Sequence, residues 1–320
     1  AGEAFFVLLT GMGIWLLRTR PTIWRIIGTA SLWTIFEWLR GQGTFGFPWG
    51  MSGHSQSPWI ALIQIVIFTG ATGTGKTTSL AAILEEINKN KAVHIVTLED
   101  PVEYIHSHKK ATFNQRELGK DFSAFSIGLR AALRQAPKVI LVGEMRDKET
   151  VEIGLSAAET GHLVLTTLHT VDAGQTINRI LGMFSADEEN QIRIRLADTL
   201  RWVCCQRLLP KAGGGRIAAF EILGTSLRVK DSILHGESEG KTYYDMMEAA
   251  RAFGWTTFDN FIVGLYEKGL ITEETAIGYS SRRSIVGRGI DLIKSARGES
   301  TSAIDKLEID AAYEKKLSKW

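Results

Sequence analysis

The chain has 320 residues, with 37 lysines and arginines against 35 aspartates and glutamates, 44% hydrophobic residues and two cysteines. This composition excludes a disordered chain, a disulfide-stabilised secreted domain and a strongly basic nucleic-acid tail. The length allows one large domain or two ordinary ones, each able to bury its own core.

Residues 1–66 differ in composition from the rest of the chain. They contain no lysine and six of the nine tryptophans, whereas basic and acidic residues balance in the sequence that follows. The apolar run over residues 4–17 is shorter than the roughly 20 residues that a membrane-spanning helix needs, and a second apolar stretch covers residues 23–39. We expect residues 1–60 to form a hydrophobic, Trp-rich helical segment that is either inserted in a membrane or lies at its interface.

Part of this first segment resembles the membrane region of bacterial apolipoprotein N-acyltransferases. The resemblance rests on Glu37-Trp38-Leu39-Arg40-Gly41, Gly46-Phe47-Pro48-Trp49 and Gly53-His54-Ser55-Gln56. Nothing after residue 66 resembles the acyl-transfer domain of that family. We therefore expect these aromatic and glycine positions to serve membrane packing rather than acyl transfer.

A phosphate-binding pattern follows the first predicted strand. Residues 61–68 are continuous, β-branched and apolar, which predicts a buried strand, and residues 78–88 predict a helix. Between them the sequence matches G-x-x-x-x-G-K-[ST], in which glycines let backbone N–H groups turn onto phosphate oxygens at the positive end of a helix. We expect Lys76 to reach the β and γ phosphates and the Thr77 hydroxyl to bind Mg²⁺. The candidate nucleotide-binding residues are Gly70, Thr72, Gly73, Thr74, Gly75, Lys76, Thr77 and Thr78.

Acidic residues follow the next two predicted strands. Residues 93–98 form one such strand, with Glu99 and Glu103 after it, and residues 138–142 form another, with Glu144 shortly after it. Acids at the carboxyl ends of parallel strands point into the crevice where ligands bind. Glu144 therefore occupies the position of a Walker B acid.

The fourth predicted strand, over residues 161–170, has a histidine at each end, His162 and His169. Seven residues of extended chain span roughly 23 Å, so at most one of the two can lie on a phosphate. His169 is the better candidate because it lies at the carboxyl end of the strand.

Together these motifs resemble the secretion and pilus motor ATPases over about residues 66–302. The resemblance rests on a Walker A motif, an Asp box, a Walker B motif and a His box in family order, at residues 70–77, 97–103, 139–147 and 157–170. It implies an α/β fold with a P-loop NTPase (RecA-like) core and a C-terminal helical bundle, preceded here by the short hydrophobic segment. We place the core at residues 61–225, the bundle at 226–285, where helical periodicity dominates, and a charged tail at 286–320.

The resemblance also implies roles for the candidate residues. Glu144 would polarise the attacking water or position Mg²⁺ through a water, Glu99 and Glu103 would order the water, and His169 would sense the γ-phosphate. ATP and Mg²⁺ are the expected substrate and metal. Cations are also expected near the γ-phosphate, and the candidates are Arg116, Arg130, Arg134 and Arg146.

The cysteines indicate which branch of the family the chain resembles. Assembly and type II secretion members carry a four-cysteine zinc insertion, whereas this chain has only the adjacent Cys204 and Cys205, which cannot form a tetrahedral site. We expect no zinc and two small core residues. This favours the retraction branch, although residues 228–235 keep little of its C-terminal motif.

The sequence therefore predicts an ATP-hydrolysing motor of the type IV pilus retraction kind, with a type II secretion or DNA-uptake motor as an alternative. The resemblance implies a homo-hexamer on the cytoplasmic side of a bacterial inner membrane, against an inner-membrane pilus platform protein. Residues 1–60 would add a membrane contact, and no nucleic acid is expected. Because the family places a PAS-like domain where this chain has its hydrophobic segment, a membrane-tethered ATP-binding module with little turnover is a second alternative.

Overall fold

The computed structural model describes residues 64–299. Its centre is a seven-stranded sheet of order β3-β2-β4-β5-β1-β6-β7, in which only the β6–β7 pair is antiparallel. The strands are β1 (Gln64–Thr69), β2 (His94–Glu99), β3 (Thr112–Glu117), β4 (Val139–Val142), β5 (Leu163–Leu168), β6 (Leu200–Pro210) and β7 (Arg216–Gly224).

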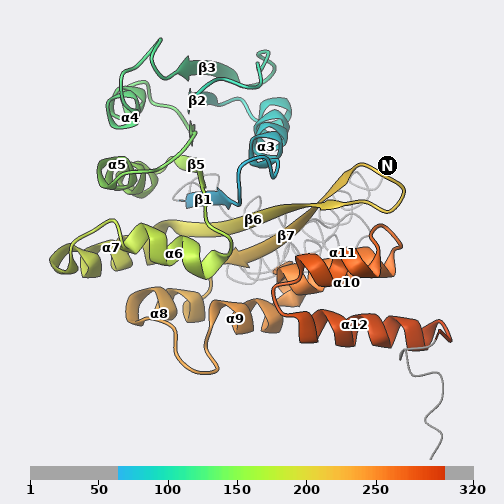
Figure 1. Cartoon of the computed structure of the whole chain (residues 1–320). Helices are drawn as coiled ribbons and strands as arrows, with labels where there is room; N and C mark the ends of the chain where they lie inside the picture. Colours follow the sequence, from blue (N-terminus) through green and yellow to red (C-terminus); the bar gives the residue numbers. More distant parts are fainter. Residues whose placement is uncertain (1–63, 300–320) are drawn as a thin grey trace, which may run out of the picture.

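Helices cover both faces of the sheet and continue into a C-terminal bundle (Figure 1). The core helices are α3 (Lys76–Asn90), α4 (Phe125–Leu133), α5 (Lys148–Glu159), α6 (Ala173–Leu181) and α7 (Ala186–Thr199). The bundle helices are α8 (Leu227–His235), α9 (Tyr243–Ala249), the short 3-10 helix Arg251–Phe253, α10 (Phe258–Glu267), α11 (Glu273–Tyr279) and α12 (Arg283–Ala296). The predicted α/β core with a C-terminal helical bundle is confirmed.

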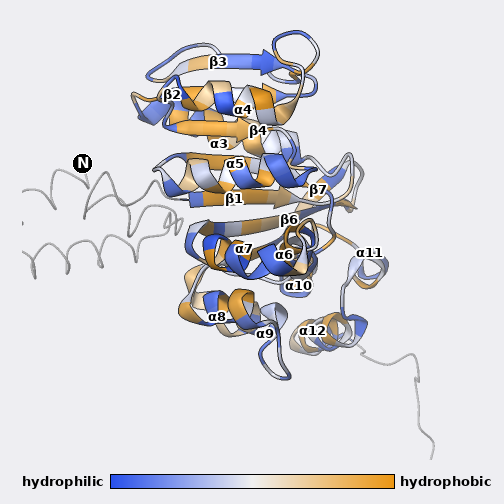
Figure 2. Cartoon of the chain, turned by 90° about the vertical axis from the view of Figure 1, so that its left-hand side faces the viewer, coloured by the Kyte–Doolittle hydropathy of each residue, from blue (hydrophilic) through white to orange (hydrophobic). Residues whose placement is uncertain are grey.

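The two faces of β1 bury different sets of side chains. Ile65 and Ile67 point toward α4 to α7, whereas Val66 and Phe68 point toward α3. A strand that is buried on both faces is largely apolar, which is why β1 and β4 are mostly orange in Figure 2. The parallel order aligns the carboxyl ends of β1, β2, β4 and β5 at one edge, where the candidate residues follow.

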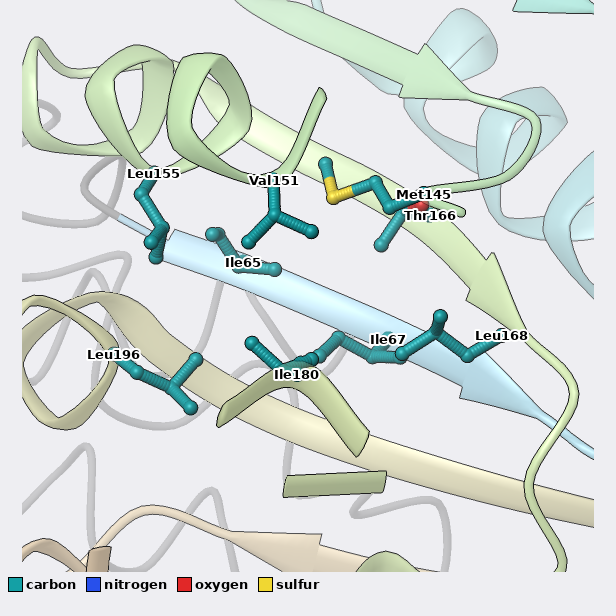
Figure 3. A pocket seen from close by; sticks show the side chains of 9 residues that line it. All are labelled: Ile65, Ile67, Met145, Val151, Leu155, Thr166, Leu168, Ile180 and Leu196. Carbon is teal, nitrogen blue, oxygen red and sulfur yellow. The ribbon is translucent and has the colours of Figure 1, made fainter. Parts of the chain in front are cut away.

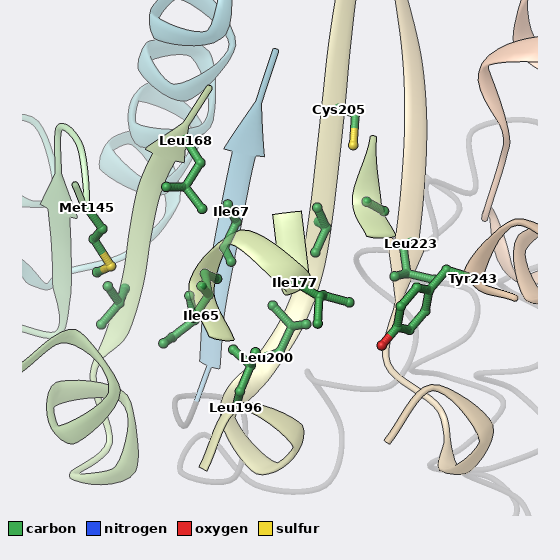
Figure 4. Packing of buried hydrophobic residues seen from close by; sticks show 14 of the residues in the cluster. Ile65, Ile67, Met145, Leu168, Ile177, Leu196, Leu200, Cys205, Leu223 and Tyr243 are labelled. Carbon is green, nitrogen blue, oxygen red and sulfur yellow. The ribbon is translucent and has the colours of Figure 1, made fainter. Parts of the chain in front are cut away.

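The core continues from the sheet into the bundle without a break. One cluster of buried side chains joins Ile65 and Leu200 of the sheet with Leu223 of β7 and Tyr243 of α9 (Figure 4). The same cluster includes Ile262 of α10. The core expected over 61–225 and the bundle expected over 226–285 therefore share their packing.

The fold differs from the sequence expectation in two respects. Strands β3, β6 and β7 were not predicted, and the charged tail begins later than residue 286. Helix α12 covers residues 283–296 because Val286 and Ile290 recur at helical spacing and are fully buried in the shared core.

None of the helices within residues 64–299 has both the length and the apolar character needed to cross a bilayer. The hydrophobic segment expected over residues 1–60 and the rest of the charged tail, from residue 300 on, lie outside the described residues.

Candidate functional site

The loop between β1 and α3 is shaped by three glycines. Gly70, Gly73 and Gly75 have φ values of 143°, 78° and 88°, in the region that side chains with a Cβ rarely enter. Gly75 is also the N-cap residue of α3, which begins at Lys76. The loop therefore wraps the positive end of α3 with its backbone, as an anion-binding site requires.

Strand β6 forms the floor of this loop through Gln206. A β-carbon at Gly70 would lie 2.4 Å from the main-chain oxygen of Gln206, and one at Gly75 would lie 3.0 Å from its side-chain nitrogen. The Gln206 side chain is buried and accepts a hydrogen bond of 2.9 Å from the hydroxyl of Ser79 on α3. Gln206 thus contacts both ends of the loop, and the sequence analysis did not identify it.

Lys76 turns its ammonium group into the loop. Its Nζ atom donates hydrogen bonds to the carbonyl oxygens of Gly70 at 2.7 Å and Ala71 at 3.0 Å, and only 8% of the residue is exposed. Burial lowers the pKa of Lys76, while the nearby carboxylate of Glu144 acts in the opposite direction. The loop therefore holds a positive charge where phosphate oxygens would lie.

The segment after β2 contacts the first turn of α3. The hydroxyl of Thr77 faces the carboxylate of Glu103 at 3.5 Å, and the hydroxyl of Thr78 hydrogen-bonds that of Tyr104 at 2.9 Å. Two adjacent residues of the segment thus meet two adjacent residues of the helix. The oxygen atoms of Thr77 and Glu103 are ligands of the kind that Mg²⁺ prefers.

Glu144 lies at the centre of a small charged cluster. Its side chain is 16% exposed, and its Oε2 atom lies 2.6 Å from Arg146 and 3.4 Å from Nε2 of His169. Burial alone raises the pKa of Glu144, but the hydrogen bond from Arg146 and the charges of His169 and Arg146 outweigh it, so that the pKa lies below its usual value. The cluster therefore keeps a carboxylate ionised beside Lys76.

Two other candidates have different surroundings. Glu99 is buried at the end of β2, where it accepts hydrogen bonds from Thr97 at 2.6 Å and Gln115 at 3.3 Å. His162, at the amino end of β5, contacts the carbonyl oxygen of Ala157 at 2.8 Å. The contacts of Glu99 thus connect β2 to β3, and those of His162 connect β5 to α5.

The four candidate arginines are dispersed. Arg146 is in the Glu144 cluster, whereas Arg130 pairs with Glu149 at 2.9 Å and the Nε atom of Arg116 contacts the side chain of Asn114 at 3.5 Å. Arg134 caps the end of α4. Of the four, only Arg146 has a contact with a candidate site residue in the structure.

The residues at the loop fit a nucleotide with its magnesium ion. Within residues 64–299 no group of three or more histidine, cysteine and acidic side chains could hold a metal by itself. Mg²⁺ at phosphoryl-transfer sites takes most of its oxygens from phosphates and waters and needs only one or two from the protein. Thr77 and, through a water, Glu144 fit that requirement.

Two family models match the chain. The model described as type II/IV secretion system protein matches residues 61–228, and that of the apolipoprotein N-acyltransferase N-terminal domain matches residues 1–84. The two matches overlap at the β1 strand, the glycine loop and the start of α3.

Curated proteins and a solved structure are similar to the chain over its larger part. The type IV pilus retraction ATPase PilT of Pseudomonas aeruginosa is 45% identical over 212 residues, which are 66% of this chain and 61% of that protein. A twitching motility protein of Neisseria gonorrhoeae is 43% identical, over 66% of this chain and 56% of that protein. A crystal structure of the pilus retraction motor PilT with bound ADP is 44% identical with a TM-score of 0.65, over 70% of this chain and 63% of that one. The chain thus spans about three fifths of the length of these relatives.

Proposed function

The chain belongs to the type II/IV secretion system protein family, and from that membership we propose that it is an ATP-hydrolysing motor of the type IV pilus retraction kind. The observation that carries this proposal is the convergence of three strand ends on one loop. Lys76 after β1, Glu144 after β4 and His169 after β5 bring a cation, an ionised carboxylate and an imidazole together. ATP hydrolysis needs such positioned charges because the protein contributes little covalent chemistry.

The glycine loop would bind the phosphates of ATP. Its backbone N–H groups and the positive end of α3 attract anions. Lys76 would exchange its hydrogen bonds with Gly70 and Ala71 for bonds with phosphate oxygens. The proposed nucleotide-binding residues are Gly70, Thr72, Gly73, Thr74, Gly75, Lys76, Thr77 and Thr78.

Glu144 would orient the attacking water. Its lowered pKa keeps the carboxylate ionised, so it can accept a hydrogen bond from water. His169, which lies beside Glu144, would sense the γ-phosphate. Glu99 and Glu103 would order the water from the β2 side. When bound, Mg²⁺ would neutralise charge on the β and γ phosphates, with Thr77 as its protein ligand and Glu144 acting through a water.

The proposal also covers the assembly, location and partner of the motor. We place the chain in a homo-hexamer on the cytoplasmic side of a bacterial inner membrane, acting on a pilus platform protein. The naming of the pilus relatives as a retraction ATPase and a twitching motility protein supports this choice. Residues 1–60 would contribute a membrane contact.

The test measures Mg²⁺-dependent ATP hydrolysis by the purified chain over a range of protein concentrations. Lys76→Ala serves as the blank, and Lys89→Ala, which removes an exposed lysine of the same helix paired with Glu85, is the matched control. We expect the specific activity to rise with concentration, to vanish in Lys76→Ala and to persist in Lys89→Ala. ATP binding with hydrolysis at the level of the blank at every concentration would reject the motor and leave a nucleotide-binding module.

A further inference from the structure

Two threonines tie the end of β5 to the end of β1. The backbone N–H of Thr170 donates to the hydroxyl of Thr69 at 2.9 Å, and this hydroxyl donates to the carbonyl oxygen of Thr170 at 2.8 Å. Thr69 is the last residue of β1, directly before Gly70, and Thr170 directly follows His169. The tether therefore fixes where His169 lies relative to the glycine loop.

The same threonine also contacts the helix that follows. The hydroxyl of Thr170 lies 2.6 Å from the hydroxyl of Thr69 and 2.6 Å from that of Thr176 on α6. Thr176 in turn donates to the carbonyl oxygen of Asp172 at 2.7 Å. Thr69 and Thr176 are fully buried, so water cannot supply a missing partner to either of them, whereas Thr170 is half-buried.

The three threonine hydroxyls have one proton each, but they make four contacts that each need a proton. Carbonyl oxygens only accept, so the proton of Thr69 serves the carbonyl of Thr170, and the proton of Thr176 serves the carbonyl of Asp172. The single proton of Thr170 remains for two contacts, one with Thr69 and one with Thr176. Two oxygens at 2.6 Å without a proton between them repel each other, so the two contacts compete.

We propose that Thr170 is a positioning residue whose hydroxyl alternates between Thr69 on β1 and Thr176 on α6 and thereby sets how closely His169 approaches the nucleotide loop. This inference rests on the proposed function, because it assigns a geometry to the ATP site. When Thr170 donates to Thr69, β5 is bound most tightly to the loop. When it donates to Thr176, this third hydrogen bond holds α6, and the two hydrogen bonds between Thr69 and the backbone of Thr170 remain.

The first experiment compares ATP hydrolysis by Thr170→Val, Thr170→Ser and Thr69→Val. Valine keeps the shape without the hydroxyl, and serine keeps the hydroxyl. We expect kcat to fall by about 10- to 100-fold in both valine variants, the KM for ATP to stay within about twofold, and Thr170→Ser to restore most of kcat. Since the two residues act as a unit, the double valine variant should be no slower than the slower single variant.

Thr166→Val is the matched control, because it removes a buried hydroxyl from β5 that has no hydrogen-bond partner in the structure. We expect it to hydrolyse ATP like the wild type. A kcat of Thr170→Val equal to that of the control, or a parallel change in kcat, KM and thermal stability without rescue by serine, would overturn the positioning role.

A second measurement does not depend on hydrolysis. Hydrogen exchange of the Thr170 amide should be faster in Thr69→Val, which removes its acceptor, and unchanged in Thr166→Val. If the wild type hydrolyses no ATP, the proposed function fails, and the tether is then judged by exchange alone. Unchanged protection of the Thr170 amide in Thr69→Val would refute the tether.

Discussion

Gly70 packs its α-carbon against the main-chain carbonyl oxygen of Gln206, so closely that a β-carbon at position 70 would lie 2.4 Å from that oxygen. The contact joins the first residue of the glycine loop to a central position of β6. Because the neighbour is backbone, it cannot rotate away as a side chain would. The shape of the loop therefore depends on a strand that lies more than a hundred residues later in the sequence.

Gly70→Ala should destabilise the fold by about 3 kcal/mol, because it adds this clash to the strain of a positive φ. Gly73→Ala is the matched control, since a β-carbon there meets nothing within 4 Å and only the φ strain of roughly 1 kcal/mol remains. Urea denaturation measures the difference in unfolding free energy between the two variants. Binding of a fluorescent ATP analogue shows whether the loop still binds nucleotide. Equal unfolding free energies for the two variants would show that β6 yields to the added methyl group.

Arg146→Ala should shift the acid limb of the kcat profile to higher pH. Burial raises the pKa of Glu144, and the hydrogen bond from Arg146 is the largest effect that lowers it. Without Arg146 the carboxylate takes up a proton at a higher pH, and a protonated Glu144 cannot orient water. Arg130→Ala, which removes the partner of the exposed Glu149, is the control.

The interaction between Arg146 and Glu144 also affects the stability of the fold. Since the pKa of Glu144 is lowered in the folded protein, its interactions stabilise the fold above the usual pKa of glutamate and are lost as the pH falls through the lowered value. An acid limb at the same pH in Arg146→Ala and the wild type would mean that Arg146 does not control the protonation of Glu144.

Thr166→Val should leave the stability unchanged or raise it by up to about 1 kcal/mol. The hydroxyl of Thr166 is the only buried side-chain polar atom without a hydrogen-bond partner within residues 64–299. Thr166 lines a cavity of about 10 Å³ (Figure 3), which is at the lower limit for one water. The surface of this cavity is apolar, so it offers a water no hydrogen-bond partner.

Thr167→Val provides the contrast on the next residue, whose hydroxyl donates to the carbonyl oxygen of Gly143 at 2.5 Å. We expect a loss of about 1 to 2 kcal/mol there. Urea denaturation of both variants measures their unfolding free energies. A loss of the same size in Thr166→Val would imply an ordered water on the Thr166 hydroxyl.

Both cysteines should be inert to thiol reagents in the native protein. Cys204 and Cys205 are buried free thiols on β6, and burial raises the pKa of Cys204 to about 12 and that of Cys205 well above its usual value. Only the thiolate reacts, so labelling should require opening of the sheet. Ser107→Cys, at an exposed position, is the positive control. Rapid labelling of either native cysteine would indicate that β6 opens easily.

The sequence analysis identified those parts of the candidate site that are local in the chain. The glycine pattern, Lys76 and Thr77 follow from eight consecutive residues, and Glu144 and His169 follow from their positions after apolar strands. Gln206 and the Thr69–Thr170 tether could not be predicted, because they depend on the neighbours of β1 in the sheet. That order is decided by packing between segments far apart in the chain.

The errors at the C-terminal side have a similar cause. Strand β6 was missed because Arg201, Gln206 and Arg207 interrupt its apolar residues, so neither a buried run nor a clean alternation appears. The start of the tail was misplaced because the charges of residues 286–296 hide the two residues, Val286 and Ile290, that bury against the bundle.

The shared core of sheet and bundle makes residues 64–299 one thermodynamic unit. Side chains from β7, α9 and α10 complete the same apolar cluster as those of β1, so neither part can lose its partner without exposing that cluster to water. Heating should therefore produce one transition, with equal calorimetric and van't Hoff enthalpies for this region. By the same reasoning a fragment cut at residue 225 would be prone to aggregate rather than fold, and the bundle cannot be exchanged as an independent module.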